Sequence, residues 1–281
     1  MKNEKILVVG LGMIGASYAC KLKLKGMYVG GISARQSTID YALEHGIIHT
    51  GSIEVTKEFV EQFDIIISAL YPKLFIEWVK KYQSYFKPGA ILTDTTGVKG
   101  SVLYEIQGFL RSDVEMIGAH PMAGRELSGI ESMDIHIFDG ANYLITPTEK
   151  NTQHAVGVAR EIGEILGFKR ISVLSPQEHD EMIAFLSQLT HCIAVSLMCC
   201  KDSKHLVEYT GDSFRDLTRI ANINENMWSE LFLMNRTQLL EQMTIFENEF
   251  AKLHKALEEC DAETMKEMMR LSTTRRKLFN K

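Results

Sequence analysis

The sequence predicts an α/β domain followed by an all-helical domain. The first observation is the distribution of turn-forming residues, because only Gly211 of the 20 glycines lies after Gly167 and all five prolines lie at or before Pro176. The second is a glycine-rich turn between a predicted strand and a predicted helix near residue 10. A domain with many turns is therefore expected over residues 1–174, and a helical domain over residues 175–281.

Composition and charge are typical of a soluble globular protein. The net charge of −5 gives no electrostatic reason to bind nucleic acid or an anionic membrane. No apolar run is expected to span a membrane, and no signal peptide is expected. The five cysteines lack paired spacing, which is typical of reduced thiols in a cytoplasmic protein. Adjacent Cys199 and Cys200 are expected in a helix core, and no metal site is expected.

The glycine-rich turn predicts a Rossmann-like, dinucleotide-binding domain. Gly10-Leu-Gly-Met-Ile-Gly15 lies between a predicted strand at residues 6–9 and a predicted helix at residues 16–25. In G-x-G-x-x-G the first glycine permits the turn, the second lets the backbone approach a pyrophosphate, and the third lets the helix pack on the strand. The phosphates bind at the helix N-terminus. The expected cofactor contacts are Gly10, Gly12, Met13, Ile14 and Gly15.

The loop after the second predicted strand, residues 28–32, bears on which nucleotide is bound. An NAD-specific site needs an acidic residue about 20 residues beyond the glycines to bind the ribose 2′-hydroxyl. This loop has hydroxyls and an arginine instead, which suit a 2′-phosphate. NADP is therefore favoured, and an ordinary polar loop with NAD bound by other groups is the alternative. The expected contacts are Ser33, Arg35, Ser37 and Thr38.

A polar run follows the strand predicted at residues 90–94. Ligands of a doubly wound sheet bind at the carboxyl ends of its strands. Asp94 is therefore expected near the cofactor, and Thr95, Thr96 and Lys99 near the substrate. For Lys99 the alternative is a solvated lysine in the first turn of a helix.

A histidine follows the strand predicted at residues 114–117. The stretch Gly118-Ala-His-Pro-Met-Ala-Gly124 places His120 between small residues and a proline, which stiffens the turn. Its imidazole can gain or lose a proton near neutral pH. Two interpretations stay open: a catalytic group, or a tight loop in which His120 only satisfies a neighbouring backbone group.

The helical part supplies further polar candidates. Ser175-Pro-Gln-Glu178 predicts a helix start with a capping box, and the helix is expected to run towards Cys200. On it, His191 belongs to a polar stripe that either faces water or lines a pocket. In a short helix at residues 213–221, Arg219 has apolar neighbours. A partly buried arginine usually has an anionic partner, here an internal acid or a substrate carboxylate.

A long helix is expected from Met227-Trp228 to about residue 259, with apolar side chains along much of its length. A helix this apolar in a small domain needs another surface to pack against. A homodimer through the helical domain is therefore expected.

Together these residues resemble the prephenate and arogenate dehydrogenase family of tyrosine biosynthesis. The motifs occur in the family's order over nearly the whole chain, at residues 10–15, 94–99, 118–124, 179–180, 187–191, 218–221 and 227–228. The glycine motif alone is unspecific. The histidine stretch combined with the arginine helix is much more specific.

The resemblance implies a nucleotide-binding domain, a helical domain that dimerises, and an active site between them. It also implies oxidative decarboxylation of prephenate to 4-hydroxyphenylpyruvate, or of arogenate to tyrosine. Hydride passes from the hydroxyl-bearing ring carbon to the nicotinamide, the hydroxyl proton is lost, and the ring carboxylate leaves as CO2. By the same resemblance His120 accepts or polarises that proton and Arg219 anchors the ring carboxylate. His191 and Trp228 line the substrate pocket.

Two departures from the family pattern stand out. Gly97 replaces a serine, so Thr95 or Thr96 takes over its role or the role is absent. Gln188 and Thr190 replace the inner histidine and the proline of a Ser-His-Leu-Pro-His motif, so this helix is expected to run on without a kink.

Two other functions remain open at the level of sequence. One is a β-hydroxyacid-type NADP dehydrogenase, whose catalytic lysine lies in a glycine-rich helix of the second domain. The single glycine of the helical part, Gly211, counts against it. The other is a non-catalytic protein that senses NADP.

Overall fold

The computed structural model describes residues 3–124, 127–202 and 204–279. The chain forms two compact units, Met1–Asn235 and Arg236–Lys281. The first unit therefore includes helices that follow residue 174. The proposed domain boundary at residues 174 and 175 remains a prediction.

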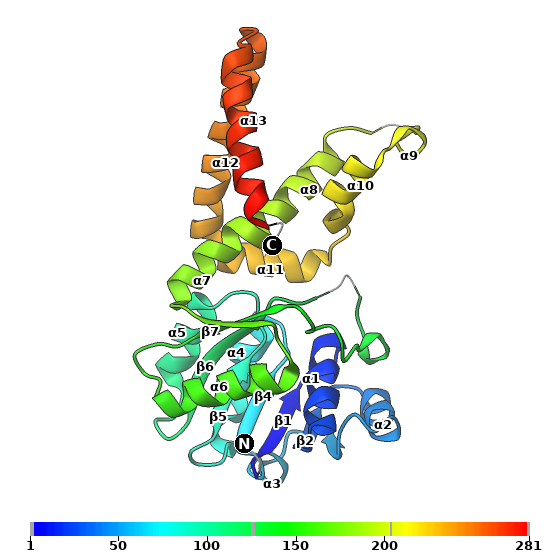
Figure 1. Ribbon diagram of the computed structural model, residues 1–281. Helices are drawn as coiled ribbons and strands as arrows, with labels where there is room; N and C mark the ends of the chain where they lie inside the picture. Colours follow the sequence, from blue (N-terminus) through cyan, green and yellow to red (C-terminus); the bar gives the residue numbers. More distant parts are fainter. Residues whose placement is uncertain (1–2, 125–126, 203, 280–281) are drawn as a thin grey trace. The chain divides into compact units, whose positions relative to one another are not determined.

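A mixed β-sheet forms the centre of the first unit (Figure 1). Its strand order is β3-β2-β1-β4-β5-β6-β7-β8, and neighbours are parallel except for β6 and β7. The chain changes direction of travel between β1 and β4, where a doubly wound sheet binds its ligand. The strands are β1 (Lys5–Val9), β2 (Tyr28–Ile32), β3 (Thr50–Ser52), β4 (Ile65–Ser68), β5 (Ile91–Asp94), β6 (Glu115–Pro121), β7 (Asn142–Thr146) and β8 (Arg170–Val173).

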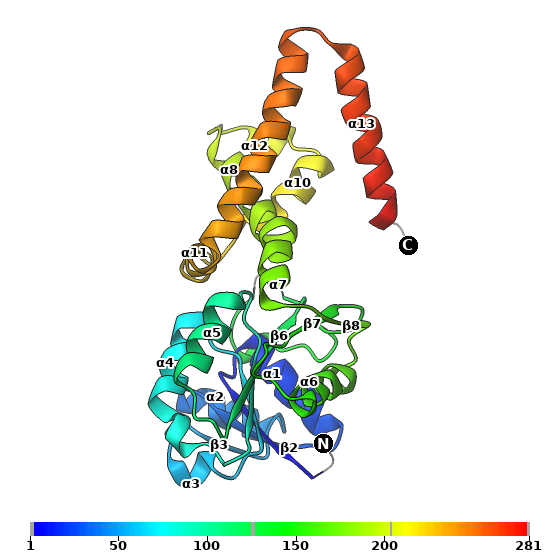
Figure 2. The same ribbon diagram turned by 90° about the vertical axis from the view of Figure 1, so that its left-hand side faces the viewer.

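Helices cover both faces of this sheet (Figure 2). Alternate residues of β1 point to opposite faces, so Ile6 and Val8 join one hydrophobic core while Leu7 and Val9 join the other. That burial on two sides explains the continuous apolar run of the strand. One face carries α1 (Met13–Leu24), α2 (Gln36–Glu44) and α6 (Gln153–Leu166), and the other carries α3 (Lys57–Val60), α4 (Pro72–Tyr82) and α5 (Gly100–Phe109).

The rest of the described chain is helical. The first unit continues with α7 (Pro176–Ile183), a π-helical turn (Ala184–Gln188), α8 (Leu189–Cys199), α9 (Leu206–Tyr209), α10 (Asp212–Thr218), a 3-10 turn (Arg219–Ala221) and α11 (Glu225–Met234). The second unit is a hairpin of α12 (Arg236–Glu258) and α13 (Ala262–Arg276), followed by a 3-10 turn (Lys277–Phe279). The predicted capping box of Ser175 and Glu178 is present at the start of α7.

Two helices differ from the sequence prediction. The expected helix from Met227 to residue 259 is interrupted at Asn235, whose buried side-chain amide donates to the Asp180 carbonyl and to Oε1 of Gln188, at 2.8 Å each. The helix through Thr190 continues without a proline kink, but it contains the π-helical turn, which the sequence pattern does not reveal. Helical π-turns often occur at functional sites.

By length and composition alone, Pro176–Cys199 is long and apolar enough to cross a membrane, which was not expected of any apolar run in the sequence. It carries no Asp, Glu, Lys or Arg after residue 181, and Phe185 and Leu186 are about half exposed, at 51% each. The five cysteines are all free, and Cys199 and Cys200 are exposed rather than part of a core.

Candidate active site

The glycine turn between β1 and α1 has the geometry of a phosphate site. Gly10 has a φ of +93°, which favours glycine, and a Cβ on Gly15 would lie 1.9 Å from the Gly10 carbonyl oxygen. A Cβ on Gly12 would meet nothing within 4 Å, so space is open there. Gly12 precedes α1 without a side-chain cap, which leaves the first N–H groups of the helix, from Met13 and Ile14 onwards, for a ligand. These residues fit a dinucleotide pyrophosphate.

The loop after β2 leads into α2 and holds the predicted contacts for the adenosine ribose. Arg35 and Ser37 are exposed, Ser33 is half-buried, and Thr38 is buried. The backbone N–H of Arg35 donates to the hydroxyl of Ser33 over 3.5 Å. Arg35 is the N-cap position of α2 and supplies no side-chain cap. A cation, a hydroxyl and a helix N-terminus therefore lie within one short loop.

At the end of β5, Lys99 and Asp94 form a fully buried ion pair. Nζ of Lys99 lies 2.5 Å from Oδ2 of Asp94 and 3.1 Å from the hydroxyl of Thr96. The other carboxylate oxygen of Asp94 accepts the backbone N–H of Ala119, at 3.1 Å. The alternative of a solvated Lys99 is therefore wrong. Lys99, Asp94 and Thr96 are all buried here, and their predicted ligand contacts remain predictions.

His120 lies on a strand and not in the tight loop that the sequence suggested. Residues up to Pro121 belong to β6, and His120 pairs with Leu144 of the antiparallel strand β7. The ladder on this side fixes the backbone of His120 at the carboxyl end of β6, one strand away from Asp94. The residue is half-buried, and its imidazole contacts His179.

No catalytic role was predicted for His179 and Asp180, although residues 179–180 are one of the family motifs. In the structure His179 contacts His120, and Asp180 contacts His179. Nε2 of His179 lies 2.9 Å from Nδ1 of His120, and Nδ1 of His179 lies 2.8 Å from Oδ1 of Asp180. Both residues are buried on the first turns of α7. The adjacent His-Asp pair just after a capping box was the available signal. Helical periodicity alone gave no reason to connect it with a strand 59 residues earlier.

The surroundings favour the neutral form of these imidazoles. Burial lowers the pKa of His120 well below its usual range, and positive charge on His179 or Lys99 lowers this pKa further. Burial also lowers the pKa of His179, against the opposing effect of Asp180. Burial lowers the pKa of the Lys99 ammonium, and Asp94 opposes that shift. A neutral imidazole is the form that can accept a proton.

Gly97 lies close to His120 and to Leu231 of α11. A Cβ on Gly97 would lie 3.5 Å from Leu231 and 3.9 Å from Cε1 of His120. Leu231 is one helical turn after Trp228 on α11, and the Trp228 ring stacks on His191 of α8 with ring centres 3.7 Å apart. Leu231 therefore lies near His120, and the stacked aromatic pair includes a residue one turn earlier on the same helix.

The remaining predicted residues have distinct settings. Thr95 is half-buried directly after β5, next to the buried Thr96. Nδ1 of His191 lies 2.8 Å from the Ser187 carbonyl oxygen. Arg219 begins the 3-10 turn that packs on α8, and it is exposed rather than partly buried.

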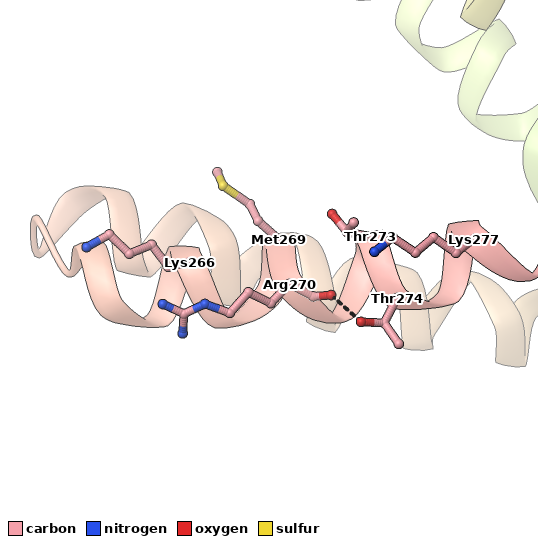
Figure 3. A pocket seen from close by; sticks show the side chains of 6 residues that line it. All are labelled: Lys266, Met269, Arg270, Thr273, Thr274 and Lys277. Atoms are coloured by element: carbon pink, nitrogen blue, oxygen red, sulfur yellow. Dashed lines mark hydrogen bonds between the residues drawn. The ribbon is translucent and has the colours of Figure 1, made fainter.

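Two other kinds of site, a metal centre and a surface hollow, bear on the choice of this region as the active site. Among them no group of three or more His, Cys, Asp or Glu side chains is placed to hold a metal ion. A surface hollow of about 420 Å³ lies along α13 and the turn after it (Figure 3). All its lining side chains come from this one stretch of helix, and none is a predicted site residue: Lys266, Met269, Arg270, Thr273, Thr274 and Lys277.

Two family profiles match the chain. Residues 18–172 match the nucleotide-binding domain of prephenate dehydrogenase, and residues 175–271 match its dimerization domain. A prephenate dehydrogenase from Lactococcus lactis is 32% identical over 254 residues, which are 86% of this chain and 68% of that protein.

Solved structures give the same result over the whole chain. A prephenate dehydrogenase from A. aeolicus, in complex with hydroxyphenyl propionate and NAD+, has a TM-score of 0.89 and 27% identity, covering 99% of both chains. Synechocystis arogenate dehydrogenase has a TM-score of 0.85 and 26% identity, covering 98% of this chain and 99% of that one.

The sheet order and the glycine turn define a dinucleotide-binding domain of the Rossmann type, with the imidazole at the carboxyl end of β6 as a candidate catalytic group. Both matched profiles, which together span most of the chain, narrow this class further. The chain belongs to the prephenate dehydrogenase family.

Proposed function

We propose that this protein oxidatively decarboxylates prephenate or arogenate, with His120 as the group that accepts the substrate hydroxyl proton. The observation that carries this proposal is the setting of His120: a rigid strand position, a half-buried imidazole, and surroundings that favour its neutral form. A base of this kind typically contributes about 10²–10⁴-fold in rate.

The chemistry follows from the substrate and these side chains. The glycine turn at residues 10–15 would hold the cofactor, which would supply the acceptor for the hydride on the ring carbon that bears the hydroxyl. His120 holds the hydroxyl proton as the carbon–oxygen bond gains double-bond character. The bond to the ring carboxylate then breaks, CO2 leaves, and its electron pair completes the aromatic ring. The phenolate oxygen takes the proton back from His120, so the imidazole is regenerated.

Arg219 is the proposed anchor of the ring carboxylate. It is exposed, and its turn packs on α8, the helix that bears His191. The stacked pair of His191 and Trp228 would supply one wall of the pocket. A hydrogen bond between an arginine and a carboxylate is worth roughly 1.5–3 kcal/mol of binding free energy, and the exposure of Arg219 favours the lower end. Arg219→Ala is therefore expected to raise KM for the substrate about tenfold.

NADP is the proposed cofactor. The loop after β2 carries no acid for a ribose 2′-hydroxyl, and it offers Ser33, Arg35 and the start of α2 to a 2′-phosphate. The A. aeolicus structure contains NAD+, so use of NAD is the alternative here.

A homodimer is the proposed assembly. The match to a dimerization domain covers residues 175–271, and large apolar side chains in that range are exposed, among them Phe185, Leu186, Phe250 and Leu257. Packing between two copies would cover such surface. The same packing, rather than lipid, is proposed for Pro176–Cys199, because His179 and Asp180 of this helix are hydrogen-bonded inside the protein. A cytoplasmic location remains our prediction.

The test is a rate measurement with four combinations of substrate and cofactor. Purified protein is mixed with prephenate or arogenate and with NAD+ or NADP+, and the absorbance of the reduced cofactor is followed. We expect turnover with at least one substrate, and a higher kcat/KM with NADP+. Absence of turnover in all four mixtures would refute the proposed function.

A further inference from the structure

We propose that Asp180 and His179 are positioning residues that fix the tautomer of His120, so that its Nε2 carries the lone pair facing the substrate. This inference rests on the proposed function for its catalytic meaning. The hydrogen-bond chain on which it stands does not depend on the substrate.

The chain starts at a carboxylate surrounded by donors. Oδ1 of Asp180 accepts the backbone N–H of Lys99, and Oδ2 accepts that of Gly100, each at 2.8 Å. Nδ1 of His179 lies 2.8 Å from the same Oδ1. Since an ionised carboxylate can only accept, Nδ1 of His179 must carry a proton and donate it to this bond. The two backbone bonds hold the carboxylate still while it orients the ring.

The tautomer of His179 in turn determines which ring nitrogen of His120 carries the proton. With Nδ1 protonated, a neutral His179 has a bare Nε2, which can only accept a hydrogen bond. Its contact at 2.9 Å is Nδ1 of His120, which must therefore be the donor. Nε2 of His120 is left unprotonated. Among the described residues, no other hydrogen bond engages this imidazole.

The charges around the pair favour the same arrangement. The ionisable groups that act on the two rings are Lys99 and Asp94 at the end of β5 and Asp180 on α7. The buried ammonium of Lys99 opposes a second positive charge on either imidazole. The proposed tautomer of His120 requires a neutral His179, and burial favours that form.

A purely structural role is the competing explanation. Asp180 accepts two N–H groups at the start of α5 and therefore ties α7 to α5 whether or not His120 is catalytic. The two explanations differ in what they predict for the protons of His120. A purely structural role of Asp180 is compatible with either tautomer of His120.

The direct test is the ring ¹⁵N chemical shifts of histidine in the whole protein at neutral pH, assigned with His120→Gln and His179→Gln variants. We expect His120 to show a protonated Nδ1 and an unprotonated Nε2. The opposite tautomer, or rapid exchange between tautomers, would overturn the proposal. This readout needs no turnover, so it separates the proposal from the proposed function.

Kinetics supply the second test. His179→Phe removes the acceptor of the hydrogen bond from His120. We expect kcat with the better substrate to fall about 10–100-fold, as for the loss of other orienting partners. KM should change less than about threefold. In His179→Gln the amide oxygen can accept from Nδ1 of His120, and at least part of kcat should return. The exposed His205→Gln serves as control and should keep full kcat.

Thermal melting accompanies each variant. Equal losses of kcat in His179→Phe and His179→Gln, with both variants folded, would overturn the positioning role. If His179→Phe does not fold, His179→Gln and the ¹⁵N shifts still decide between the explanations. A wild-type protein with the expected tautomer but no turnover would refute the proposed function and leave the tautomer assignment standing.

Discussion

The ammonium of Lys99 and the carboxylate of Asp94 form an ion pair inside the protein: Nζ lies 2.5 Å from Oδ2, and neither side chain has exposed surface. The same carboxylate accepts the N–H of Ala119, which precedes His120 on β6. The pair therefore connects the end of β5 to the strand that carries the proposed base.

Lys99→Ala is expected to lower the free energy of unfolding by about 3–5 kcal/mol, because it leaves Asp94 buried without its cation. The measurement is urea unfolding followed by circular dichroism. Lys87→Ala is the matched control, because its ion pair with Asp64 is partly exposed, and it should cost at most about 1 kcal/mol. Equal effects of the two substitutions would show that the buried pair does not stabilise this region.

The glycines of the first turn should separate folding from cofactor binding. A Cβ at position 12 meets no protein atom, so Gly12→Ala should fold normally and yet weaken NADP binding at least tenfold, because its methyl group occupies the approach of the pyrophosphate. Gly15→Ala should lower the melting temperature as well, since its Cβ overlaps the Gly10 carbonyl. Calorimetric titration and melting curves measure both. Normal NADP affinity in Gly12→Ala would argue against this turn as the phosphate site.

Stability should decrease in mild acid. Burial holds the pKa values of His120 and His179 below those of the unfolded chain, where histidine titrates near 6.5. Below that pH the unfolded chain binds more protons than the folded one, so the free energy of unfolding falls as pH is lowered, and above it these two groups have no effect. The slope per histidine is at most about 1.4 kcal/mol per pH unit.

Unfolding titrations between pH 5 and pH 8 test this expectation. His179→Gln should remove part of the slope. A wild-type profile with no slope below pH 6.5 would contradict the burial of neutral imidazoles.

Arg35→Ala should distinguish the two cofactors. A charge-assisted hydrogen bond to a 2′-phosphate is worth roughly 1.5–3 kcal/mol, and the exposure of Arg35 favours the lower end. KM for NADP+ should therefore rise about tenfold, whereas KM for NAD+ should change less than about threefold. Equal changes for both cofactors would mean that Arg35 does not contact the group that distinguishes them.

The local parts of the fold were predictable from the sequence, because each depends on neighbouring residues. The glycine turn, strand β2 and the capping box of α7 lie where the sequence pattern placed them. The interruption at Asn235 was not predicted, and the side chain of this residue donates a hydrogen bond to Asp180, 55 residues away. The strand setting of His120 also escaped prediction, since it requires the pairing of β6 with β7.

The candidate site, like the fold, was predictable only in part. Residue types identified His120, but its partner His179 comes from a separate helix and is visible only in three dimensions. For Lys99 the sequence left a solvated side chain or a substrate contact open. In the structure its ammonium contacts Asp94, and its backbone N–H donates to Asp180 of α7, 81 residues later.

The measurement that tests the central claim most directly is the ratio of products. Purified protein is supplied with NADP+ and with prephenate or arogenate labelled at the ring carboxylate, and labelled CO2 and reduced cofactor are counted in the same samples. We expect one CO2 for each reduced cofactor. In His120→Asn the release of CO2 and the reduction of the cofactor should be lost together. Reduced cofactor without matching CO2, or full activity of His120→Asn, would contradict it.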